Sequence, residues 1–110
     1  CEGSGLTAQL QFDRIPLLEQ VAFYLDAGAV PGGTLRNFDS YGAKVGALTD
    51  SQRAILCDPQ TSGGLLVAVS AESESEVQAL LRQHGLSDQP IGQLLSGSGS
   101  AALIELVAAL

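Results

Sequence analysis

A polar loop with two glycines runs directly into an apolar segment of strand length, and together they read Cys57-Asp58-Pro59-Gln60-Thr61-Ser62-Gly63-Gly64-Leu65-Leu66-Val67-Ala68-Val69. Pro59 favours an extended backbone at the residue before it. The paired glycines can adopt backbone angles that are closed to other residues. Residues 65–69 are apolar without interruption, which predicts a strand that is covered on both faces. We therefore expect the second half of the fold to be organised around this buried strand.

The loop at 57–64 fits two interpretations. It could be a substrate- or phosphate-facing loop at a strand end, with these residues facing a cleft: Asp58, Gln60, Thr61, Ser62, Gly63 and Gly64. From the residues alone, the favoured interpretation is a tight turn whose polar side chains bond to its own amides. It is not a P-loop, because the G-x-x-x-x-G-K-[ST] pattern is missing and its glycines precede a strand rather than a helix.

The sequence after the apolar segment indicates a helix and two further strands. A helix is expected over residues 72–84, with Ser70 or Ser73 at its start, and Ser73 begins a capping-box pattern. Gly85 is expected to end this helix in the left-handed conformation. Strands are expected over residues 91–95 and 102–107.

The sequence before the loop indicates one strand and two helices. Residues 7–12 alternate between apolar and polar types, which is typical of a half-buried strand. Apolar residues within 17–25 recur at helical spacing, and Gly28 can end that helix. A short helix is expected over 50–56, with Thr49 or Asp50 as its N-cap.

These elements predict an α+β fold. A strand–helix–strand unit is followed by a hairpin, which a Ser/Gly turn at 96–100 would close. We expect a mixed, mainly antiparallel sheet of about four or five strands, with helices packed on it. The chain has 110 residues, which suits one domain over 1–110.

A second polar cluster reads Pro31-Gly32-Gly33-Thr34-Leu35-Arg36-Asn37-Phe38-Asp39-Ser40-Tyr41-Gly42. In one interpretation it is a binding loop in which Arg36 meets an anion and Asn37 or Asp39 hydrogen-bonds a ligand or a neighbouring domain. In the other it is an irregular loop that Phe38 and Tyr41 pin to the core. The candidate binding residues of this second loop are Gly32, Gly33, Thr34, Arg36 and Asn37.

Composition and charge exclude several classes of partner. The formal net charge is −7, with twelve acidic residues against five scattered basic ones. Without a basic stripe, neither a nucleic acid nor an anionic membrane is an expected partner. The apolar runs are too short to cross a bilayer. The sequence contains no Met, so we expect a fragment or a processed piece of a longer protein.

The cysteines and the single histidine give no catalytic or metal assignment. Cys1 and Cys57 do not make a disulfide framework, and a reduced, cytoplasmic state is the simpler expectation. Cys1 has no neighbour that would lower its pKa, and Cys57 is expected to be buried and inert. His84 has no ligand partner at zinc spacing and is explained by helix packing. We assign no catalytic residue and no metal ligand.

Three blocks carry a resemblance to a known family. In their order and separation, Val30–Thr34, Arg36–Gly42 and Cys57–Leu66 resemble the carboxy-terminal part of the selenophosphate synthetases (selenide, water dikinases), members of the aminoimidazole-ribonucleotide-synthetase-like superfamily. The Asp-Pro-Gln-Thr-Ser-Gly-Gly string is the most specific of these matches. The resemblance extends over nearly the whole chain.

The resemblance implies an enzyme that makes selenophosphate from ATP, selenide and water and releases AMP and phosphate. It also implies that ATP, Mg²⁺ and the reactive Cys or selenocysteine with its Lys are held mainly by an amino-terminal half. None of those motifs is found in these residues. In particular, Lys44 does not lie beside a Cys in a glycine-rich leader. We therefore expect no cofactor in this piece, and no activity from it alone.

The same resemblance gives the expected partners. They are the missing amino-terminal domain of the enzyme and, for the full-length parent, a second copy in a cytoplasmic homodimer. The alternative is a free-standing, non-catalytic binding or scaffold module that uses the loop at 31–42.

Overall fold

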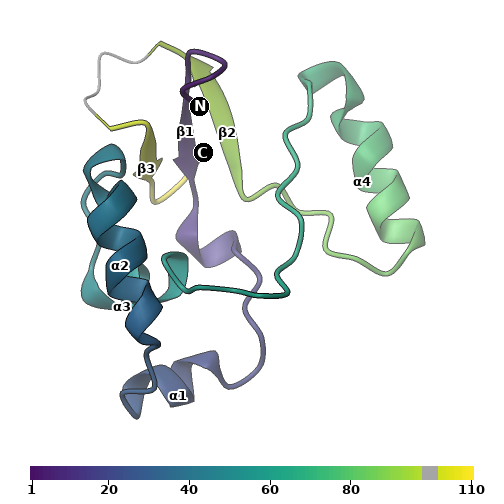
Figure 1. The fold of residues 1–110 in the computed structure, drawn as a ribbon. Coiled ribbons are helices and arrows are strands. Elements are labelled where there is room, and N and C mark those ends of the chain that lie inside the picture. Colours follow the sequence, from purple (N-terminus) through teal and green to yellow (C-terminus); the bar gives the residue numbers. More distant parts are fainter. Residues whose placement is uncertain (98–101) are drawn as a thin grey trace. The chain divides into compact units, whose positions relative to one another are not determined.

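The computed structural model describes residues 1–97 and 102–110. It divides the chain into two compact units, one formed by Cys1–Pro59 with Ile91–Leu110 and the other by Gln60–Pro90. In the described part of the chain, the first unit holds a three-stranded sheet and the helices α1, α2 and α3, and the second unit holds α4 (Figure 1). The α+β class expected from the sequence is confirmed.

The sheet is built around the first strand. β1 (Leu6–Leu10) lies between β2 (Gly92–Ser96), which is antiparallel to it, and β3 (Ile104–Leu106), which is parallel. The sheet is mixed, as expected, but within residues 1–97 and 102–110 it has three strands rather than four or five. The predicted hairpin is wrong because β1 separates the two strands that it would have joined. Most of its predicted turn at 96–100 lies outside the described residues.

The strand predicted over residues 65–69 is absent from the structure. These residues have an irregular backbone and are exposed. A strand needs hydrogen-bonding neighbours, and local apolar character alone cannot supply them. The burial that we expected for Leu65 and Val67 is wrong for the same reason.

Two of the three helices in the first unit differ from expectation. α1 (Val21–Asp26) begins four residues later than the expected helix, and Gly28 after it has a φ of +80°, as its role in ending the helix predicted. α2 (Gly32–Tyr41) forms where a loop was expected. Pro31 precedes this helix with extended backbone angles, so it occupies a position that needs no intrahelical N–H group. Short 3₁₀ turns at Phe12–Arg14 and Gly42–Lys44 connect these elements.

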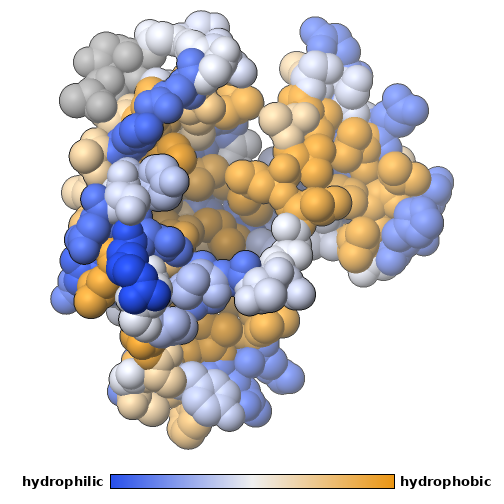
Figure 2. All heavy atoms as spheres, in the orientation of Figure 1, coloured by the Kyte–Doolittle hydropathy of each residue, from blue (hydrophilic) through white to orange (hydrophobic). Residues whose placement is uncertain are grey.

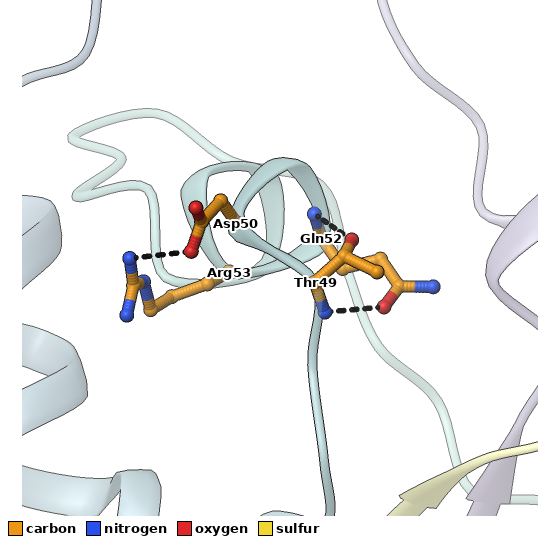
Figure 3. A network of polar contacts seen from close by, with 4 residues as sticks. All are labelled: Thr49, Asp50, Gln52 and Arg53. Atoms are coloured by element: carbon orange, nitrogen blue, oxygen red, sulfur yellow. Dashed lines mark hydrogen bonds and ion pairs between the residues drawn. The ribbon is translucent and has the colours of Figure 1, made fainter.

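The third helix, α3 (Asp50–Leu56), confirms its prediction at both the boundary and the cap. Figure 3 shows the reciprocal pair at its start: the Gln52 amide donates to Thr49 Oγ1 at 3.2 Å, and the Thr49 amide donates to Gln52 Oε1 at 2.9 Å. Arg53 Nη2 lies 2.9 Å from the Asp50 carboxylate on the same helix. The two bonds between Thr49 and Gln52 give acceptors to two backbone N–H groups at the start of the helix that would otherwise lack them.

The second unit contains a 3₁₀ turn (Ala71–Ser73) followed by α4 (Glu74–Gln83). The predicted capping box at Ser73 is wrong, because this side chain makes no capping hydrogen bond and its backbone is already helical. Its hydroxyl instead accepts from Ser70 Oγ at 3.4 Å. Gly85 has a φ of +66°, which confirms the expected left-handed end of the helix.

Burial is concentrated at β1 and α2. In the described part of the chain, the fully or nearly fully buried residues are Thr7 and Ala8 on β1 and Thr34 on α2. A backbone hydrogen bond also links the start of β3 to the 3₁₀ turn at Gly42–Lys44, since the Leu103 amide donates to the Lys44 carbonyl at 2.8 Å. None of the described helices is both long and apolar enough to span a membrane.

Candidate functional site

The structure joins the two glycine-containing stretches at one helix. An ideal Cβ added at Gly33 would lie 2.8 Å from Pro59 Cγ, so the first turn of α2 and the proline ring are in direct contact. Asn37, one turn further along, donates from Nδ2 to the Cys57 carbonyl at 2.9 Å. We call Gly33, Arg36 and Asn37, together with Cys57 and Pro59, the α2 face. Helical spacing places its three α2 residues on one side of the helix.

Arg36 is the cation of the α2 face. Its Nη2 lies 3.7 Å from the position where a Gly33 Cβ would stand, which places the guanidinium over the first turn of the helix. The residue is exposed, so its donors are open to a partner. Ser40 continues the same side of the helix and donates from its hydroxyl to the Arg36 carbonyl at 2.9 Å.

Thr34 does not share this surface. It is fully buried, with 0% of its surface exposed. Its Oγ1 has no hydrogen-bond partner among the described residues. Among the candidate residues of the second loop, the structure therefore separates Thr34, which is interior, from Gly32 and Arg36, which are exposed, and from Gly33 and Asn37, which are half-buried.

The loop at 57–64 is divided between the two units. Asp58 is half-buried and belongs with Cys57 and Pro59 to the first unit. The remaining candidates are exposed and belong to the second unit: Gln60, Thr61, Ser62, Gly63 and Gly64. An ideal Cβ at Gly63 would lie 2.7 Å from Gln60 Oε1, whereas one at Gly64 would meet nothing within 4 Å. A role for these residues at a cleft stays a prediction.

Neighbouring side chains hold α2 against α3. The Arg53 guanidinium carbon lies 5.2 Å from the centre of the Phe38 ring, a distance at which a cation and an aromatic face attract each other. Phe38 also packs on the end of α2, because a Cβ at Gly42 would lie 2.7 Å from its ring. Tyr41, which was expected to pin this segment to the core, is instead exposed.

An open pocket that the sequence did not predict lies beside Lys44. Its volume is about 400 Å³, and its lining includes Glu2, Tyr41, Lys44, Val45 and Ile104. Lys44 Nζ lies 2.7 Å from Glu2 Oε1. The hydrogen bond and the positive charge of Lys44 lower the pKa of Glu2. The only sequence signal was that Lys44 is the single lysine, which did not reveal its partner.

The cysteines and the histidine lie apart from any cluster of ligands. Cys1 is exposed, Cys57 is half-buried rather than fully buried, and neither forms a disulfide. His84 caps the end of α4 and is exposed, so the packed position that we expected is wrong. Across residues 1–97 and 102–110, no three His, Cys, Asp or Glu side chains are grouped to hold a metal ion.

The α2 face therefore offers a guanidinium, a carboxamide and close backbone contacts, which suit recognition by hydrogen bonding and charge. The fold and the α2 face together define a small α+β domain that carries a polar surface on one of its helices. The chain belongs to the family described as AIR synthase related protein, C-terminal domain, whose model matches residues 1–105.

Curated relatives also match this chain over nearly its whole length. The chain is 61% identical over 100 residues to the selenide, water dikinase of Aeromonas salmonicida (strain A449), an alignment that covers 91% of this chain and 29% of the relative. It is 60% identical over 107 residues to the protein of the same name from Aeromonas hydrophila, covering 97% of this chain and 31% of the relative. It is 55% identical over 100 residues to that of Pseudomonas putida, covering 91% and 29%.

The chain thus spans about 30% of the length of the curated relatives that it matches. The resemblance to selenophosphate synthetases seen in the sequence is confirmed by these relatives and by the family match.

Proposed function

We propose that this chain is the carboxy-terminal domain of an enzyme that makes selenophosphate from ATP, selenide and water, releasing AMP and phosphate. The observation that carries the proposal is the 60–61% identity to two selenide, water dikinases over 91–97% of the chain. Identity at this level over nearly the whole chain favours a shared role in the parent enzyme.

In this proposal the domain supports the chemistry without performing it. ATP, Mg²⁺ and the reactive residues belong to an amino-terminal domain, which is the expected partner, and the parent is a cytoplasmic homodimer. What supports a recognition role here is the α2 face, where Arg36 and Asn37 present donors beside the start of the loop at 57–64.

The test compares the full-length protein with the 110-residue chain. Phosphorus NMR should show selenide-dependent conversion of ATP to AMP by the full-length protein and none by the chain alone. Calorimetric titration of the chain alone should show no tight binding of ATP. Turnover by the chain, or micromolar affinity for ATP, would contradict the supporting role.

A paired substitution tests the cleft-facing loop. In the full-length protein, Ser62→Ala should lower turnover about fivefold if its hydroxyl bonds the substrate or closes the cleft, since one hydrogen bond contributes on the order of 1 kcal/mol. The control is Ser75→Ala on the exposed surface of α4, which removes the same hydroxyl elsewhere. Equal turnover of both variants, at unchanged melting temperature, would remove the loop from the cleft.

A further inference from the structure

Asn37 differs from the other polar residues of α2. Arg36, Asp39 and Ser40 are exposed, and hydrophilic residues are prominent over this helix on the face in view (Figure 2). Asn37 is half-buried, and its Nδ2 donates at 2.9 Å to the carbonyl oxygen of Cys57, a residue twenty positions further along the chain. Asn37 therefore joins two segments of the chain, whereas its neighbours face water.

The carbonyl that Asn37 binds stands where the loop at 57–64 begins. Cys57 is the C-cap of α3 and the first residue of this loop. Two residues later, the Pro59 ring lies against Gly33, which is one turn before Asn37 on α2. Proline has a fixed φ and restricts the residue before it. A hydrogen bond at residue 57 and a packing contact at residue 59 thus fix both ends of a three-residue entry to the loop.

The helix that provides these contacts is itself held in place. The Arg53 guanidinium carbon lies 5.2 Å from the centre of the Phe38 ring, which joins α3 to α2 next to Asn37. All of these residues belong to the first compact unit, Cys1–Pro59 with Ile91–Leu110. The support for the start of the loop therefore does not depend on where the second unit lies.

We propose that Asn37 is a positioning residue for the proposed reaction: its carboxamide holds the Cys57 carbonyl and so fixes the point from which the loop at 57–64 extends. This rests on the proposed function, because the role of that loop at a cleft belongs to that proposal. Asn37 acts through the loop and does not itself contact the substrate. If the start of the loop moves, its polar groups move with it, and a misplacement of about 1 Å can lower a rate about a hundredfold.

Asn37→Asp in the full-length protein tests this role, because it replaces the donor NH₂ group with an oxygen of nearly the same size. A carboxylate cannot donate to the Cys57 carbonyl, so two acceptors would face each other. We expect kcat for selenide-dependent AMP release to fall at least about tenfold. KM for ATP should change by less than about twofold, because ATP is assigned to the amino-terminal domain.

Gln11→Glu is the matched control. Gln11 is also half-buried, and its Nε2 donates to a distant backbone carbonyl, that of Ala108, at 3.0 Å. This substitution removes the same kind of donor and adds the same charge, away from the loop and from the α2 face. Its kcat should stay within about twofold of that of the unaltered protein. Equal kcat values in Asn37→Asp and Gln11→Glu would overturn the positioning role.

Urea denaturation of each variant separates positioning from stability. The fall in kcat for Asn37→Asp should persist when rates are expressed per folded molecule. A fall that disappears after this correction would show that Asn37 only stabilises the fold, and would overturn the proposal. If Asn37→Asp does not fold, Asn37→Ala and Gln11→Ala replace the pair, with the same directions expected.

The two proposals fail separately. Selenide-dependent AMP release with equal kcat in Asn37→Asp and Gln11→Glu would remove the positioning role and keep the proposed function. If the unaltered full-length protein releases no AMP, the proposed function fails, and hydrogen exchange then tests the hold on Cys57.

The exchange measurement uses a backbone amide beside the bond from Asn37. The Cys57 amide donates to the Arg53 carbonyl at 3.0 Å and is protected by that bond. It should exchange at least about tenfold faster in Asn37→Asp than in Gln11→Glu, read by mass spectrometry on peptides that cover residues 55–58. Equal exchange in the two variants would overturn the hold of Asn37 on the loop.

Discussion

Gly33 lies against Pro59 where the two glycine-containing stretches meet. A methyl group at position 33 would stand 2.8 Å from the proline Cγ and 3.1 Å from its Cβ. The proline ring cannot rotate away, so either α2 or the backbone at 59 must shift. Overpacking of this kind typically costs about 1–3 kcal/mol.

Gly33→Ala should therefore lower the free energy of unfolding of this chain by about 1–3 kcal/mol, measured by urea denaturation. Gly32→Ala is the matched control, because a Cβ there meets nothing within 4 Å. Alanine favours a helix over glycine, so the control should be neutral or stabilising by up to about 1 kcal/mol. Equal losses in both variants would show that the contact with Pro59 is unimportant.

The Glu2–Lys44 pair makes a prediction about pH. Its hydrogen bond and charge hold the pKa of Glu2 below the ordinary 4.5. A carboxylate with a lowered pKa in the folded state contributes stability above its ordinary pKa, and this contribution is lost as pH falls through the lowered value. The pair should therefore weaken under acid conditions, below the ordinary glutamate range.

Lys44→Gln should raise the pKa of Glu2 toward 4.5, measured by NMR titration of the side-chain carboxyl. Glu72 is an internal control. Its pKa is lowered by its own backbone amide and by the Ser70 hydroxyl, so it should titrate unchanged in the variant. An unmoved Glu2 would mean that Lys44 is not its partner in solution.

At the scale of elements, α3 and α4 begin in contrasting ways. Thr49 caps α3 in a reciprocal pair with Gln52 (Figure 3). Ser73 before α4 makes no capping bond. Thr49→Ala should cost about 1 kcal/mol of unfolding free energy in urea denaturation, because it leaves a helix amide without its acceptor. Ser73→Ala should change stability by less than about 0.5 kcal/mol. A larger loss at position 73 would contradict the assigned caps.

The same contrast shows what local sequence could predict. The cap of α3 was predictable because Thr49 and Gln52 are neighbours whose interaction needs no other segment. The helix at α2 was not predicted, because its glycines and Asn37 individually favour loops. Packing of Gly33 on Pro59 and the bond from Asn37 to Cys57 come from a distant stretch and outweigh that preference.

At the scale of the molecule, local stability should differ along the chain. Residues 60–70 are exposed throughout, whereas β1 is paired on both sides and carries the buried Thr7 and Ala8. A protease selective for apolar residues should make its first cut of the 110-residue chain within residues 64–70, at least about tenfold faster than in β1. Mass spectrometry of the early fragments measures this. A first cut within residues 6–10 would contradict it.

The sequence predicted the candidate site only in part, as it did the fold. The sequence placed Arg36 and Asn37 among the binding candidates, and the structure puts both on one side of α2. It could not show that Thr34 would be interior or that Lys44 would pair with Glu2, since both follow from tertiary contacts. The apolar character of residues 65–69 likewise predicted a strand, whereas these residues have an irregular backbone in the structure.

The order of strands has a consequence for synthesis. β1 is synthesised well before its two neighbours at residues 92–96 and 104–106. While the nascent chain grows, this strand has no native partner, and its apolar side chains remain open to chaperones or to other unfinished chains. Assembly of the sheet must therefore wait until nearly all of these 110 residues have been translated, and its high contact order favours slow closure.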